Sequence, residues 1–85
     1  MKTIGAIATY TGTAHRWMTG LTVKEIEVHR GEDDDGECFE DDADLQRAGG
    51  LQPGDILYVK PWVEREGRFS FATSDATADE LTFAE

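Results

Sequence analysis

The chain has little of several things that would define its class. It contains one cysteine, Cys38, so it can form neither an internal disulfide nor a zinc site built from several cysteines. No apolar run approaches the ~18 residues that span a bilayer, and the N-terminal segment lacks the long apolar stretch of a secretory signal. We therefore expect a cytoplasmic protein with no membrane partner.

Basic residues are also scarce: eight Lys and Arg residues stand against eighteen Asp and Glu residues, which gives a net charge of −10. Such a chain repels phosphate, so we expect no direct binding to nucleic acid. Half of the acids lie within 32–44, where there is no base; they are Glu32, Asp33, Asp34, Asp35, Glu37, Glu40, Asp41, Asp42 and Asp44. The other nine acids are nearly balanced by the eight bases, which all lie outside this segment. The excess negative charge therefore belongs to this one segment.

Residues that could carry out chemistry are few. Cys38 lies among carboxylates, which raise the pKa of a thiol and suppress its reactive thiolate form. Ser70 and Ser74 belong to no nucleophile-elbow motif. Besides carboxylates, only His15, His29 and Cys38 could bind a transition metal, and the sequence gives no sign that they converge. We expect no enzyme activity, no cofactor and no metal site.

The acidic segment does not match a calcium loop. A hand-type loop needs oxygen ligands at positions 1, 3 and 5, glycine at position 6 and an acid at position 12. A loop that starts at Asp33 has Cys38 at the glycine position, and one that puts Gly36 there starts at Gly31. Only weak, nonspecific cation binding is expected from these carboxylates.

The length of 85 residues is enough for one domain, 1–85, and too short for two. Alternating or β-branched apolar patterns predict strands at 3–10, 21–30, 56–63 and 68–73, with a short strand at 37–40. The expected fold class is α+β, a small β-rich roll or partly open barrel of four to five mostly antiparallel strands with one short helix. The predicted core consists of Ile4, Ile7, Leu21, Val23, Ile26, Val28, Leu45, Leu51, Ile56, Leu57, Val59, Phe69 and Phe71.

Three further predictions concern irregular parts of the chain. The apolar residues of the second strand change face, which a β-bulge near 24–25 would repair. The segment 32–48 is predicted to be an acidic loop followed by a short helix, which the glycines after it would end. The tail, 74–85, is predicted to be a short helix or a flexible end held by Leu81 and Phe83.

The stretch 45–61 contains a turn whose sequence resembles part of PDZ domains. Gly50, Leu51, Gly54 and Asp55 match the Gly-Leu-x-x-Gly-Asp pattern that opens a core strand there, and similar turns open strands in AbrB-like and other small barrels. The resemblance implies a helix, a tight turn and a buried strand over about a fifth of the chain. The glycine loop and the second helix that form a PDZ peptide groove have no counterpart in the sequence.

A dense surface of one charge can act as a ligand for a basic groove, because carboxylates can imitate the phosphates of a nucleic acid. In size and charge the chain resembles viral DNA mimics and anti-CRISPR inhibitors. We therefore expect a non-catalytic inhibitor or adaptor whose nine clustered acids occupy the basic surface of a nucleic-acid-binding protein or complex. Trp17 and Trp62 are the expected apolar anchors.

Other interpretations of the same residues stay open. The acidic segment could be only a solvated loop between strands. The protein could also be a structural or assembly subunit of a larger complex, or a binding module that responds to divalent cations.

Overall fold

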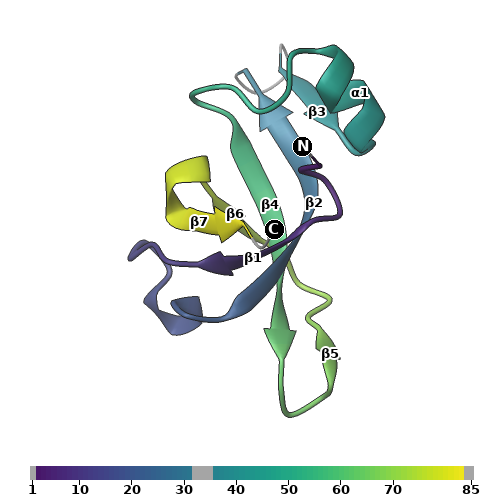
Figure 1. Ribbon diagram of the computed structural model, residues 1–85. Coiled ribbons are helices and arrows are strands. Elements are labelled where there is room, and N and C mark those ends of the chain that lie inside the picture. Colours follow the sequence, from purple (N-terminus) through teal and green to yellow (C-terminus); the bar gives the residue numbers. More distant parts are fainter. Residues whose placement is uncertain (1, 32–35, 84–85) are drawn as a thin grey trace.

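The computed structural model describes residues 2–31 and 36–83, which form one open antiparallel sheet of seven strands and a single short α-helix (Figure 1). The strands are β1 (Ile7–Tyr10), β2 (Thr22–Arg30), β3 (Glu37–Phe39), β4 (Ile56–Val63), β5 (Arg68–Phe69), β6 (Ser74–Ala76) and β7 (Leu81–Phe83). The helix is α1 (Asp42–Arg47), and two 3-10 turns are η1 (Arg16–Met18) and η3 (Ala78–Glu80). None of these helices is long and apolar enough to cross a membrane.

The β-rich, mostly antiparallel architecture is confirmed, but the count of four to five strands is too low. The two strands that the sequence did not predict, β6 and β7, have only three residues each, too few for an alternating pattern to stand out in the sequence. Strands β6 and β7 lie in the segment 74–85, whose described residues 74–83 form these two strands with the 3-10 turn η3 between them. Leu81 is buried and Phe83 packs against the core, as predicted for the residues that hold this segment.

Strands β2 and β4 form the centre of the sheet and run along most of the molecule (Figure 1). One side of β2 pairs with β1 near its start and with β3 near its end, while its other side pairs with β4. Strands β5 and β6 pair with β4, and β7 pairs with β1. As a result β3 and α1 lie at one end of the molecule and the β4–β5 hairpin at the other (Figure 1).

A β-bulge in β2 confirms the prediction from the sequence, one residue further along than expected. The register between β2 and β4 shifts between Glu25 and Glu27. Because of the extra residue, Val23, Glu25 and Val28 all face the core and are fully buried. The same shift turns Glu27 and the residue two positions later, His29, to the opposite face of the sheet.

The core lies against the inner face of β2 and β4. Its buried apolar residues are Ile4, Ala8, Tyr10, Met18, Val23, Val28, Phe39, Leu45, Leu57, Val59, Ala76 and Leu81. Full burial of Leu57 and Val59 confirms the predicted strand 56–63. Two predicted core residues are exposed instead: Ile7 is 36% exposed where it pairs with Lys24 on the outer face, and Phe71 is 78% exposed beyond the end of β5.

The turn that resembles PDZ domains leads into β4, as the resemblance implies, and Gly54 adopts a positive φ of 89° there. Asp55, directly before the strand, is buried. Its carboxylate accepts hydrogen bonds from Arg30 Nε (2.9 Å), Arg30 Nη2 (2.8 Å) and the backbone N–H of Gln52 (2.8 Å). The Arg30 hydrogen bonds hold the pKa of Asp55 below its ordinary value, and the pair joins the end of β2 to the start of β4.

Glu25 is the exception within the core. Its side chain is fully buried, and neither carboxylate oxygen has a hydrogen-bond partner among the described residues. Removal from water disfavours the charged form and raises the pKa of Glu25 from 4.5 to about 7. Glu25 faces inward by simple alternation from Val23, directly before the bulge, and is thus an ionisable group on the buried face of the sheet.

We expect this burial to make stability fall as pH rises. Between pH 4.5 and about 7 the folded protein keeps a proton on Glu25 that the unfolded chain releases, so the free energy of unfolding decreases across this window. The loss should be on the order of 3 kcal/mol between pH 5 and 8. Denaturant unfolding at both pH values measures it, and Glu25→Gln should remove most of the difference. The exposed control Glu64→Gln should behave as the wild type, and a wild type equally stable at both pH values would contradict the prediction.

Candidate functional site

The predicted acidic surface is only partly within the described residues. Glu32, Asp33, Asp34 and Asp35 lie outside them. The remaining five acids belong to β3, α1 and the link between them, at one end of the molecule (Figure 1); they are Glu37, Glu40, Asp41, Asp42 and Asp44. Glu37 and Glu40 are exposed, and neither forms an ion pair among the described residues.

Asp42 has a structural role that its place in an acidic run does not reveal. Its Oδ1 atom accepts hydrogen bonds from the backbone N–H groups of Thr3 (2.7 Å) and Ile4 (2.9 Å). Partial burial acts to raise the pKa of Asp42, but these two donors outweigh it and hold the pKa below its ordinary value. Asp42 therefore attaches the N-terminal segment to α1.

Two neighbouring acids also act locally. The Asp41 side chain caps α1 by accepting a hydrogen bond from the backbone N–H of Ala43 (2.9 Å), which satisfies one free donor of the first helical turn. Asp44 forms an ion pair with Arg47, one turn further along the exposed side of the helix. Part of the charge at this end is thus used to start and stabilise α1.

The two tryptophans predicted as anchors lie on one shallow groove. Trp17, from η1, is 64% exposed, while Trp62, from β4, is half-buried and packs edge-on against Phe69 with ring centroids 5.1 Å apart. The groove has a volume of about 360 Å³ and continues over Leu21 and Pro61. Most of its lining residues belong to the β4–β5 hairpin. That hairpin lies at the end of the molecule away from β3 and α1 (Figure 1). Among the described residues, the predicted partner-binding acids and tryptophans therefore lie at opposite ends of the molecule.

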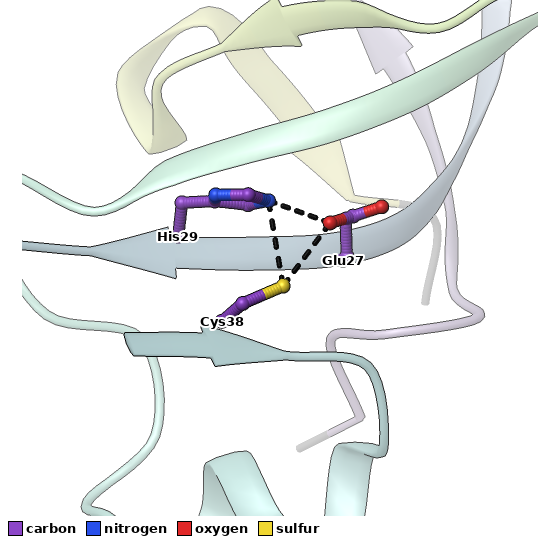
Figure 2. Close-up of side chains that lie close together, drawn as sticks. All are labelled: Glu27, His29 and Cys38. Carbon is purple, nitrogen blue, oxygen red and sulfur yellow. Dashed lines mark hydrogen bonds and ion pairs between the residues drawn. The ribbon is translucent and has the colours of Figure 1, made fainter. Parts of the chain in front are cut away.

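A cluster that the sequence did not predict lies on the outer face of the sheet. Figure 2 shows Glu27 and His29 on β2 and Cys38 on β3, with their side chains turned toward one another. Glu27 Oε2 is 2.5 Å from His29 Nε2 and 3.1 Å from Cys38 Sγ, and Sγ is 3.5 Å from Nε2. The β2–β3 register brings them together by placing His29 directly opposite Cys38.

The electrostatics of this cluster favour a protonated thiol. Partial desolvation, the hydrogen bond to Glu27 and the charges of Glu27 and Glu40 raise the pKa of Cys38 to about 11. The direction agrees with the prediction from the sequence. Hydrogen bonds from His29 and Cys38 in turn hold the pKa of Glu27 below its ordinary value.

The cluster does not have the geometry of a catalytic triad. In a triad the nucleophile and the carboxylate contact opposite nitrogens of the imidazole, so that one orients the ring while the other exchanges a proton. Here Glu27 and Cys38 both contact Nε2 of His29. The three polar atoms converge on one point, an arrangement that suits a shared cation better than proton relay.

An open pocket adjoins the cluster. It has a volume of about 390 Å³ and is lined by His29, Arg30, Gly31, Gly36, Glu37, Cys38, Ile56 and Tyr58. The Tyr58 ring lies 4.5 Å from the His29 ring, centroid to centroid, and supports it from β4. The pocket gives solvent and small ligands access to His29 and Cys38.

Comparisons with protein-family models, with curated proteins and with solved structures find no match for this chain. Its function must therefore be argued from the surfaces described above.

We expect substitutions of the acids at this end to differ in how much they lower the free energy of unfolding. Asp42→Ala should destabilise the protein by about 2 kcal/mol, because two backbone donors lose a charged acceptor. Asp44→Ala removes the same charge from an exposed ion pair and should cost less than about 1 kcal/mol. Denaturant unfolding of the two variants compares them directly, and equal losses would show that the Asp42 contacts contribute nothing special.

Proposed function

We propose that the protein is a non-catalytic inhibitor or adaptor that binds the basic, nucleic-acid-binding surface of a partner protein through its acidic segment, 32–44. The segment presents carboxylates densely and without a base among them. Long-range attraction would accelerate the encounter with a positively charged groove and would exclude negatively charged partners.

The observation that carries this proposal is that Arg30 and Arg47 at this end already have acidic partners. Arg30 is held by Asp55, and Arg47 pairs with Asp44 on α1. Glu37 and Glu40 are exposed, with no ion pair among the described residues. Glu37 and Glu40 therefore present negative charge to solvent at this end.

A second candidate function, that of an assembly subunit, is favoured by the groove between Trp17 and Trp62. An exposed tryptophan such as Trp17, beside a shallow and partly apolar groove, is a typical contact residue of protein interfaces. Because this groove lies at the end away from the acidic segment, the two functions predict different sensitive residues.

Removal of charge should weaken partner capture without harming the fold. The test variant replaces Asp33, Asp34 and Asp35 with Asn and Glu37 with Gln, which keeps shape and hydrogen-bond acceptors. Immobilised wild-type protein is exposed to nuclease-treated lysate at low and at physiological salt, and captured proteins are challenged with double-stranded DNA. Capture should be lost in the variant and should weaken as salt rises, because both changes reduce the electrostatic attraction. DNA should release the captured partner, because it competes for the same basic surface.

The matched control removes four exposed acids elsewhere, by replacing Glu64 and Glu66 with Gln and Asp75 and Asp79 with Asn. It should capture the partner nearly as the wild type does. Capture that survives the test variant and resists DNA, but is lost in Trp17→Ala, would overturn the acidic-surface proposal in favour of the assembly subunit.

A further inference from the structure

We propose that Glu27, His29 and Cys38 form a binding site for a zinc ion, which would join β2 to β3 on the outer face of the sheet. The proposal concerns residues outside the groove and, apart from Cys38, outside the acidic segment. It does not depend on the proposed function.

Geometry is the first support. One carboxylate oxygen, one imidazole nitrogen and one sulfur lie within 4.8 Å of one another (Figure 2). Tetrahedral zinc, with bonds of about 2.0–2.3 Å, holds such atoms about 3.3–3.6 Å apart. The Sγ to Nε2 distance of 3.5 Å already fits, and the Sγ to Oε2 distance of 3.1 Å nearly does.

The Glu27–His29 pair must open the most. Glu27 Oε2 and His29 Nε2 are 2.5 Å apart, so an ion between them would push them apart by somewhat less than 1 Å. Both side chains can make this movement, because their exposed fractions are 30% and 42% and neither belongs to the core. The ion would take the place of the protons that now join the three groups.

The donor types select the metal class. A thiolate and an imidazole favour zinc and similar first-row ions, whereas calcium and magnesium require oxygen ligands alone. Three protein ligands leave the fourth position of a tetrahedral ion open, and the pocket beside His29 and Cys38 would admit water or a small ligand there. The Tyr58 ring, packed on His29, limits the movement of the imidazole.

The expectation from the sequence that no ligand set surrounds Cys38 follows from the scarcity of transition-metal ligands other than carboxylates. Glu27 and His29 lie eleven and nine residues before Cys38, on a different strand. The sequence does not show how these two strands pair. The bulge in β2 and the register of β3 bring these side chains together.

Titration with Co²⁺, which replaces zinc and is visible by absorption, tests the site in reducing, chelator-free buffer. One equivalent per chain should produce thiolate-to-cobalt charge-transfer absorption, which Zn²⁺ but not excess Ca²⁺ abolishes. Cys38→Ser should eliminate this absorption, and His29→Gln should weaken binding more than about tenfold.

Matched controls separate the site from general attraction to carboxylates. His15 also contacts a carboxylate, that of Asp75 at 2.9 Å, but has no cysteine beside it, so His15→Gln should bind Co²⁺ as the wild type does. The variant lacking four charges at 33–37 should keep the charge-transfer absorption and the one-to-one stoichiometry. Because Cys38 is exposed, Cys38→Ser should fold normally, as circular dichroism will verify. No charge-transfer absorption in the wild type, or absorption that persists in Cys38→Ser, would overturn the proposal.

Discussion

An extra residue in β2 determines which side chains face the core and which face solvent. Without the shift between Glu25 and Glu27, strict alternation would direct Glu27 and His29 inward and Val28 outward. With it, Val28 is buried beside Leu57 of β4, and the two polar residues share the outer face with Cys38. Glu25, directly before the shift, faces the core with Val23 in either register and stays buried without a hydrogen-bond partner among the described residues. The burial of Val28 and the exposed polar cluster therefore have a common origin in the bulge.

The acids of this protein differ more in their surroundings than their distribution along the chain suggests. Asp55 lies inside, bound to Arg30, and fixes the turn before β4. Asp42 accepts two backbone N–H groups and holds the N-terminal segment. Glu37 and Glu40 are exposed. Because a carboxylate with backbone or arginine donors stabilises the fold while a solvated one mainly adds repulsion, a count of charges cannot separate the two kinds.

The sequence predicts what depends on local patterns and misses what depends on pairing between distant segments. The bulge could be predicted because the apolar residues of one strand change face, and the Gly54–Asp55 turn because its residue types are specific to turns. Ile7 was assigned to the core as an apolar strand residue, yet its pairing with Lys24 places it outside. The Glu27, His29 and Cys38 cluster requires the β2–β3 register. The opposite charges of Arg30 and Glu37 are the one sequence feature that points to this register. If these two residues pair across the strands, His29 lies opposite Cys38.

The two proposed sites are close enough to influence each other, because Cys38 lies between the exposed acids Glu37 and Glu40. A negative field raises the local concentration of cations, so the charge that would attract a basic partner also favours a divalent ion at the cluster. Because the bound ion replaces the proton of the Cys38 thiol, it would add one net positive charge at the edge of the acidic surface and lower its attraction for the partner. Linkage is reciprocal, so a bound basic partner would weaken metal affinity by the same factor. Occupancy of both sites together is therefore less favourable than their separate affinities imply, and the coupling should weaken as salt screens the charges.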